Sequence, residues 1–253
     1  VTNLEDSGPG SLRQTIADAV SGDVIVFDAA LSGGTITLTS GQLYINKDLT
    51  IGGPGAENLT ISGGGSYRVF NIGSGVTVAI SGLTIADGYV RNSRGAGILN
   101  NGSLTLDQTV VNGNQIDGDL LAILSWGGSG IYNGGTLMIT QSTISNNSDI
   151  ALSGGGGGIY NVGTFVLEDS QVIDNHVHTT QVFGEYGGGG ICNRGTATIT
   201  RSVISGNTAA GYSYGGGGGI FNNNSLILAS STIRGNSSLA ESTGAWGGYA
   251  GGI

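Results

Sequence analysis

Apolar and polar positions alternate along short segments that recur through the second half of the chain. In the segment 136–139, Leu137 and Ile139 share one face, whereas Thr136 and Met138 share the other. This period of two is typical of β-strands. The same apolar face recurs in four further segments, as Leu104/Leu106, Phe165/Leu167, Ala197/Ile199 and Leu226/Leu228. A second short strand follows each of them, with Val111, Ile144, Val172, Ile204 and Ile233 on the same face.

These strands belong to a longer repeat. Five segments align without a gap over 17 residues, at 98–114, 131–147, 159–175, 191–207 and 220–236, and a sixth begins at Ile253. Variable segments of 16, 11, 15, 12 and 16 residues follow the five frames. A run of Gly precedes the first Ile of each frame, such as 154–158 and 215–219, and we interpret it as a third strand. Three strands per turn predict an all-β, right-handed parallel β-helix with rungs about 4.8 Å apart.

Two columns of Asn run through the frames. The third and the last position of every frame is Asn: Asn100, Asn133, Asn161, Asn193 and Asn222 in one column, and Asn114, Asn147, Asn175, Asn207 and Asn236 in the other. Asn tolerates the left-handed turn conformation, and its amide can bond the Asn one rung away. We therefore expect structural asparagine ladders, with a stacked hydroxyl column at positions 109, 142, 170, 202 and 231.

The N-terminal stretch differs from the repeats. Residues 11–20 place Leu12, Ile16, Ala19 and Val20 on one helical face, and Ser11 can act as N-cap with Gln14 three residues on. A short helix there would cover the open end of a solenoid. We predict one β-helix domain over 1–253, with an N-terminal cap (1–22), irregular early rungs (23–97) and regular rungs with variable inserts (98–253). Because a new frame starts at Ile253, we expect the domain to be excised from a longer protein with further domains.

Composition excludes several classes of protein. The chain has 51 Gly among 253 residues, 38% hydrophobic residues and only 10% charged residues, which does not fit a disordered chain. Its formal charge is −9, with eight basic residues, so we expect no nucleic-acid partner. No apolar run approaches 18 residues, so we expect no membrane insertion. The single Cys192 permits no internal disulfide.

Two groups of residues carry a resemblance to a known family. The opening Asp6-Ser7-Gly8-Pro9-Gly10-Ser11-Leu12-Arg13-Gln14 resembles the start of β-helix domains in bacterial secreted and surface proteins. The Gly-Gly-Ile-Tyr-Asn and Ser-Thr-Ile-Ser-x-Asn repeats are similar to those of the pectate-lyase-like β-helix superfamily. The resemblance implies the fold and a secreted or cell-surface location. It does not select a function, because that superfamily includes lyases, glycoside hydrolases, adhesins and non-catalytic binding domains.

Catalytic and metal-binding groups form no complete set. The only Lys is Lys47, in the N-terminal region, and no Asp-Asp pair occurs. Candidate catalytic carboxylates are Glu168, Asp169, Asp174 and Glu185, which could act only as a pair facing one bond. Asp117, Asp119 and Asp149 are candidate Ca²⁺ ligands, although no acidic loop repeats, and His176 and His178 lack a third metal ligand. This pattern favours a protein that is not an enzyme and has no cofactor.

Aromatic residues gather in the variable segments. They are Trp126, Tyr186, Tyr212, Tyr214, Trp246 and Tyr249, close to the start of the Gly runs. A strand of Gly has no side chains, so a ligand could approach its flat outer surface closely. Aromatic rings beside such a surface can stack on the C–H faces of sugars. We therefore predict a non-catalytic carbohydrate-binding module for a neutral, plant-type polysaccharide. The alternatives are rings that only fasten the inserts, a surface adhesin or structural domain, and a polysaccharide lyase or glycoside hydrolase. An ice-binding plane is disfavoured because Met138, Val166 and Ile227 interrupt the Thr positions.

Overall fold

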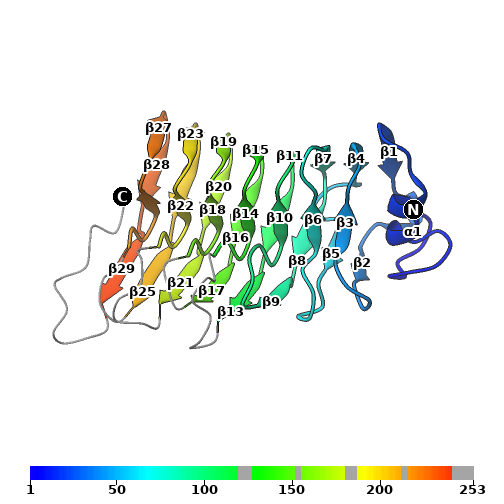
Figure 1. The fold of residues 1–253 in the computed structure, drawn as a ribbon, viewed down its shortest axis with the longest axis horizontal. Helices are drawn as coiled ribbons and strands as arrows, with labels where there is room; N and C mark the ends of the chain where they lie inside the picture. The colour runs from blue at the N-terminus through cyan, green and yellow to red at the C-terminus, as the bar shows by residue number, and fades with distance from the viewer. Residues whose placement is uncertain (119–126, 152–154, 180–186, 212–215, 241–253) are drawn as a thin grey trace.

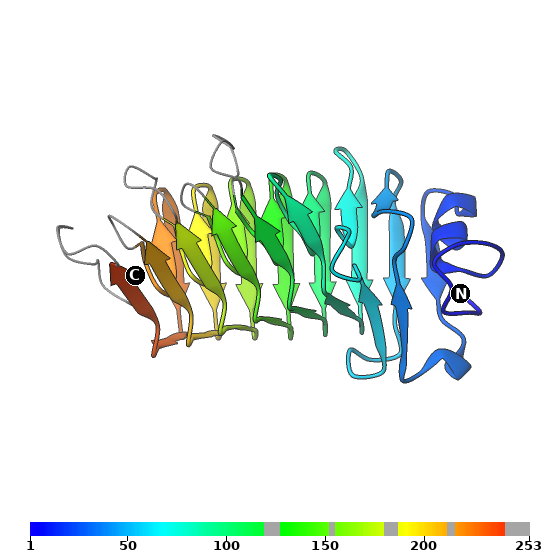
Figure 2. The same ribbon diagram turned by 90° about the horizontal axis from the view of Figure 1, so that it is seen from below.

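The computed structural model describes residues 1–118, 127–151, 155–179, 187–211 and 216–240. These residues coil into an elongated solenoid in which each sheet runs along the long axis (Figures 1 and 2). Within the described residues, two sheets have eight strands, one has seven and one has six. Neighbouring strands pair in parallel in all four sheets. The prediction of a parallel β-helix is therefore confirmed.

The four sheets are named here A to D. Sheet A contains β1 (Asp23–Val26), β4 (Leu49–Gly52), β7 (Thr77–Ser81), β11 (Ser103–Asp107), β15 (Thr136–Thr140), β19 (Thr164–Glu168), β23 (Thr196–Thr200) and β27 (Ser225–Ala229). Sheet B contains β2 (Gly34–Thr37), β5 (Leu59–Ser62), β8 (Thr84–Ala86), β12 (Val110–Asn112), β16 (Thr143–Ser145), β20 (Gln171–Ile173), β24 (Val203–Ser205) and β28 (Thr232–Arg234). Sheet C contains β3 (Leu43–Ile45), β6 (Phe70–Ile72), β10 (Ile98–Asn100), β14 (Ile131–Asn133), β18 (Ile159–Asn161), β22 (Ile191–Asn193) and β26 (Ile220–Asn222). Sheet D contains β9 (Tyr89–Arg91), β13 (Gln115–Asp117), β17 (Ser148–Ala151), β21 (His176–Thr179), β25 (Thr208–Gly211) and β29 (Ser237–Ala240).

A short helix, α1 (Leu12–Asp18), covers the N-terminal end of the solenoid beside β1 (Figure 1). The Ser11 side chain accepts a hydrogen bond from the Gln14 backbone N–H at 3.2 Å, so the predicted N-cap is confirmed. Leu12 and Ile16 are buried in the main core. The helix is shorter than predicted: it ends before Val20, which is 66% exposed. A 3₁₀ turn, η1 (Ala29–Leu31), follows β1.

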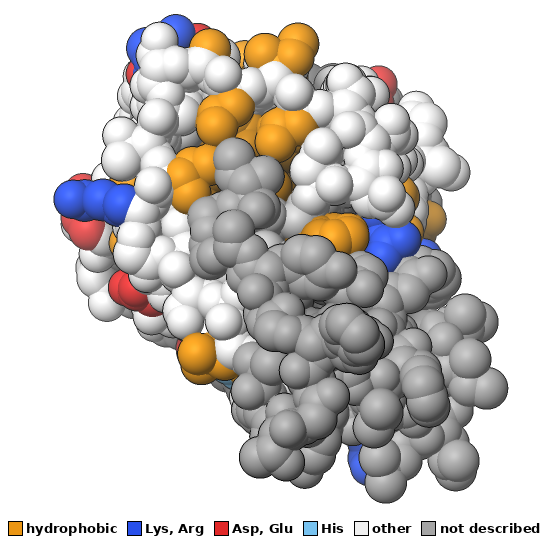
Figure 3. Space-filling view, turned by 90° about the vertical axis from the view of Figure 1, so that its left-hand side faces the viewer, with side chains coloured by type: hydrophobic (Ala, Val, Ile, Leu, Met, Phe, Trp, Pro, Cys, Tyr) orange, Lys and Arg blue, Asp and Glu red, His pale blue; other side chains and the backbone are white. Residues whose placement is uncertain are grey.

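The inward apolar columns form one continuous core. Ile131, Leu137, Ile139 and their equivalents in the other regular turns are buried together with the early strands and α1. Leu226 is only partly buried, because its strand β27 has one neighbour within the described part of sheet A. Apolar side chains are accordingly in view on this end face (Figure 3).

Both asparagine ladders are present. In the first, each amide Nδ2 donates to the next Oδ1 from Asn100 to Asn222, at 2.7–2.8 Å. In the second, from Asn114 to Asn236, every such bond is 2.9 Å long. The hydroxyl column is also confirmed, because the hydroxyls of Ser142, Ser170, Ser202 and Ser231 each accept from the backbone N–H of the column residue one rung earlier. The left-handed residues are the ones before the second ladder, such as Asn146 and Asp174, rather than the ladder residues themselves.

The regular turns contain four strands rather than the three predicted. The additional strand is that of sheet D, which begins directly after the second ladder, within segments interpreted as inserts. The Gly runs are not the third strand, because the sheet C strands start at the frame Ile and the runs make only isolated bridges, such as Gly156 with Gly188. The four variable segments that are followed by a further described frame all connect a sheet D strand to the next sheet C strand, on one side of the solenoid.

Candidate functional site

The aromatic candidates and two of the carboxylates lie outside the described residues. They are Trp126, Tyr186, Tyr212, Tyr214, Trp246, Tyr249, Asp119 and Glu185. Their proposed roles in binding, catalysis or metal coordination stay predictions from the sequence.

The Gly runs do not form an open floor. Gly155 to Gly158 are all buried. A Cβ atom on Gly157 would lie 2.5 Å from the carbonyl oxygen of His176, the first residue of β21, and closer still to that of Gly189 in the next turn. A Cβ on Gly158 would lie 2.7 Å from the carbonyl oxygen of Gly190. Glycine is needed here because the sheet D strand packs directly on the run, and this packing fills the surface that a sugar was predicted to approach.

A row of polar side chains instead follows the corner between sheets A and B. Each sheet A strand of the regular turns ends one residue before a left-handed position, with φ of 49° at Gln108, 48° at Gln141, 47° at Asp169 and 48° at Arg201. The left-handed residue turns the chain from sheet A into sheet B and leaves its side chain in solvent. We call positions 107–108, 140–141, 168–169 and 200–201 the polar corner. Since rungs repeat about every 4.8 Å, the corner presents a regular series of polar groups along the long axis.

Two candidate catalytic carboxylates are neutralised on this corner. The Arg201 guanidinium donates to both oxygens of Asp169, from Nε at 2.9 Å and from Nη2 at 3.0 Å, and it also pairs with Glu168. The hydrogen bonds from Arg201 hold the pKa of Asp169 below its usual range. Asp169 therefore stays ionised at neutral pH and does not supply the proton that a general acid needs.

Asp174 lies on a different corner from Glu168 and Asp169. The strand β20 separates them, and Asp174 occupies the left-handed turn before the second ladder, with φ of 54°. Its side chain is exposed. The structure therefore does not bring Asp174 together with the other two carboxylates.

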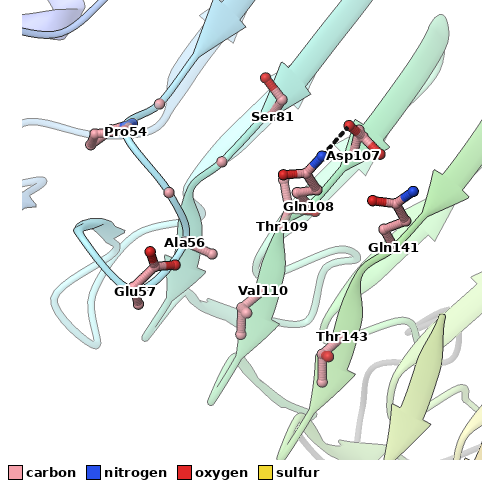
Figure 4. Close-up of a pocket in the computed structure, with 13 residues that line it drawn as sticks. Pro54, Ala56, Glu57, Ser81, Asp107, Gln108, Thr109, Val110, Gln141 and Thr143 are labelled. Carbon is pink, nitrogen blue, oxygen red and sulfur yellow. Dashed lines mark hydrogen bonds between the residues drawn. The ribbon is translucent and has the colours of Figure 1, made fainter.

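The polar corner opens into a cavity of about 600 Å³ at its N-terminal end (Figure 4). One wall is the loop 53–57 between β4 and β5, and the other is formed by the ends of β7, β11 and β15 with the residues that follow them. The loop is fastened to the next turn by three hydrogen bonds: Gly53 N–H to Ser81 O at 2.8 Å, Gly55 N–H to Gly82 O at 3.1 Å, and Thr84 Oγ1 to Ala56 O at 2.6 Å. Its shape is therefore set before any ligand arrives.

The groups that line this cavity are mostly polar and partly uncommitted. The Asp107 carboxylate accepts from Thr140 Oγ1 at 2.7 Å and from Gln108 Nε2 at 3.4 Å. Gln141, on the next turn, is exposed, and its side-chain amide has no hydrogen-bond partner among the described residues. Glu57 faces this wall from the other side of the cavity (Figure 4). The cavity thus offers amide donors and acceptors with one carboxylate on either side.

The candidate Ca²⁺ ligands Asp117 and Asp149 are not brought together. In sheet D, Ile116 pairs with Asp149, and Asp117 pairs with Ile150. Because successive residues of a strand alternate between its faces, the two carboxylates lie on opposite faces. Asp149 is fully buried, neither of its oxygens has a hydrogen-bond partner in the described structure, and burial raises its pKa to about 8.

His176 and His178 lie on the same strand, with ring centroids 6.2 Å apart. Over the described ranges, no three His, Cys, Asp or Glu side chains are grouped closely enough to hold a metal ion. In the same ranges, no helix has the length and apolarity needed to cross a membrane.

Comparison with known proteins identifies no family. No family model matches the chain, and no curated protein matches it. A solved structure of a mutant of AlyGC, an alginate lyase of the PL6 family, is similar with a TM-score of 0.30 and 13% sequence identity. The match covers 96% of this chain and 54% of that one, so the chain spans about half the length of the lyase. With a TM-score this low, the fold rests on the strand pairing described above.

Proposed function

We propose that this protein is a non-catalytic carbohydrate-binding module that recognises a neutral polysaccharide outside the cell. The observation that carries the proposal is the preformed cavity at the end of the polar corner, with the exposed amides of Gln108 and Gln141 on its wall. Sugar hydroxyls pair well with side-chain amides, which both donate and accept hydrogen bonds. Because the corner repeats along the axis, a polymer could contact several turns at once.

The carboxylates support binding rather than catalysis. Glycoside hydrolysis needs two carboxyl groups across one bond, one of them protonated. Asp169 is held ionised by Arg201, and Asp107 is engaged by Thr140 and Gln108. A neutral ligand is favoured because a chain with a formal charge of −9 repels acidic polymers at long range.

The aromatic residues of the inserts belong to this proposal as a separate, sequence-based element. Trp126, Tyr186, Tyr214 and Trp246 are the rings that we expect to stack on sugars, with Tyr212 and Tyr249 as additional rings. In the sequence they follow the sheet D strands, whereas the polar corner lies between sheets A and B. The proposal therefore separates into two surfaces that can be tested independently.

Affinity gel electrophoresis against a panel of soluble neutral polysaccharides tests the proposal. A variant with Gln108→Ala and Gln141→Ala is expected to bind more weakly by about 1–3 kcal/mol, since each amide bond contributes about 0.5–1.5 kcal/mol. Gln115→Ala, an exposed position on sheet D away from this cavity, is the matched control and should bind like wild type. Trp126→Ala and Trp246→Ala test the insert surface in the same gels.

Product analysis of the same mixtures separates the alternatives. Release of reducing sugar or of an unsaturated product that is lost in Glu168→Ala would contradict the non-catalytic assignment. If no polysaccharide retards the protein, the carbohydrate proposal is wrong and a surface adhesin or structural domain becomes the better interpretation.

A further inference from the structure

A second cavity, of about 420 Å³, lies at the start of sheet D, away from the polar corner. The strand β9 forms one wall, and it is the first strand of sheet D, so only its other edge pairs with β13. The opposite wall comes from Gln42 and the segment Ser66 to Arg68. The backbone N–H of Tyr89 donates to Tyr67 O at 3.1 Å, which joins the two walls.

The central group of this cavity is the guanidinium of Arg68. It is fixed by neutral acceptors only: Nε donates to Gly95 O at 2.9 Å, and Nη2 donates to Arg94 O at 2.8 Å and to Ser93 Oγ at 3.0 Å. Nη1 donates to the Gln42 side-chain oxygen. These bonds orient the fork of the guanidinium firmly, and a second N–H of Nη1 has no acceptor in the described structure.

The positive charge of Arg68 is not neutralised. No carboxylate pairs with it within the described residues, in contrast to Arg13 with Asp6 and Arg201 with Asp169. Burial lowers the pKa of Arg68 because the charged form loses contact with water. A half-buried charge without a counter-ion costs free energy, and an anion in the cavity would reduce that cost.

The rest of the lining suits an anion carried by a ring. Arg91 adds a second guanidinium from β9, and Tyr67 and Tyr89 add aromatic surface. One acid lies beside this lining: Asp117 pairs in register with Arg91 and accepts from the Tyr89 hydroxyl at 3.0 Å, but it does not line the cavity. Asp117 should weaken anion binding without preventing it.

We infer that this cavity is an oxyanion-binding site, in which Arg68 holds a carboxylate, sulfate or phosphate group, Arg91 adds positive charge to the lining, and the tyrosines contact the ring that carries the anion. A hydrogen bond from a guanidinium to such an oxyanion is charge-assisted, and the remaining N–H of Arg68 Nη1 can donate one. The inference does not depend on the proposed function, since the two cavities share no residue.

Isothermal titration of the full chain with sodium sulfate and with glucuronate, at constant ionic strength, tests the site. Both anions should bind, glucuronate more tightly than sulfate because of its ring, and glucose should not bind. Arg68→Gln should weaken binding by about 10- to 100-fold, because hydrogen bonds to a charged group are lost. Arg234→Gln, which removes the same charge from exposed β28, is the matched control and should bind like wild type.

Two further variants test the site even if Arg68→Gln does not fold. Arg91→Gln, on an exposed residue, should weaken binding severalfold, and Asp117→Asn should tighten it. Equal binding of glucose and glucuronate, an equal loss in Arg234→Gln and Arg91→Gln, or no binding of either anion above the chloride background would overturn the inference.

Discussion

Asp149 should destabilise this protein at neutral pH. Its side chain is fully buried between Ile116 and Val177 of the neighbouring sheet D strands, both of which are also buried. Its Oδ2 lies against Gly127 and Gly155, where a Cβ atom would clash with it. No hydrogen bond reaches either carboxylate oxygen from the described residues. The folded protein therefore favours the protonated, neutral carboxyl.

The magnitude follows from the pKa. Burial raises the pKa of Asp149 from 3.8 to about 8, so the folded state keeps a proton that the unfolded state loses above pH 3.8. The full stability is present below that pH and falls as pH rises towards 8. Each pH unit in this window costs about 1.4 kcal/mol, so about 4 kcal/mol is lost by pH 7.

Asp149→Asn removes the titration while keeping the shape of the side chain. We expect the variant to be more stable than wild type by up to about 4 kcal/mol at pH 7 and to differ little near pH 3.8. Urea unfolding between pH 4 and 8 measures this difference, with Asp174→Asn, at an exposed turn, as the control. If wild type loses no more stability than Asp149→Asn between pH 4 and 8, the reasoning is refuted.

Two further predictions concern the repeat itself. Asn161→Ala removes the ladder bonds to Asn133 and Asn193 and should lower the free energy of unfolding by about 2–4 kcal/mol. Asn223→Ala, at an exposed position, is the control and should change it little. The midpoints of urea unfolding measure both variants, and equal effects would contradict a structural ladder. Gly157→Ala should destabilise the protein, because the added methyl group would clash with the backbone of β21 and of the next turn. Gly52→Ala is the control, because no atom lies where its methyl group would be. Similar melting temperatures for the two variants would show that the Gly run is not closely packed.

Much of the fold was predictable because three of the four sheets carry side chains that repeat in identity. The frame Ile, the two Asn columns and the alternating Leu and Ile positions mark sheets A, B and C. Sheet D was missed because its inward column, Ile116, Asp149, Val177 and Ala209, has no common residue type. The Gly runs gave no side-chain period, so their contact with sheet D could not be inferred.

The candidate sites were less predictable than the fold. The cavity of the polar corner depends on loop 53–57, in the irregular early turns, folding beside residues about 50 positions later in the chain. The only sequence signal was the column of polar residues before the stacked hydroxyls, in which Glu168 and Asp169 had been considered for catalysis. Their pairing with Arg201, one turn away, needed the register between turns.

The asparagine ladders also give the interior of the solenoid an electrical polarity. In both ladders every amide donates in the same direction, from the lower-numbered turn to the higher, so the amide dipoles are aligned head to tail. Aligned hydrogen bonds polarise one another, which strengthens each bond in a chain beyond its value in isolation. A break in the middle of a ladder therefore divides one long polarised chain into two short ones and weakens bonds several turns away. The stability of each turn consequently depends on turns that it does not touch.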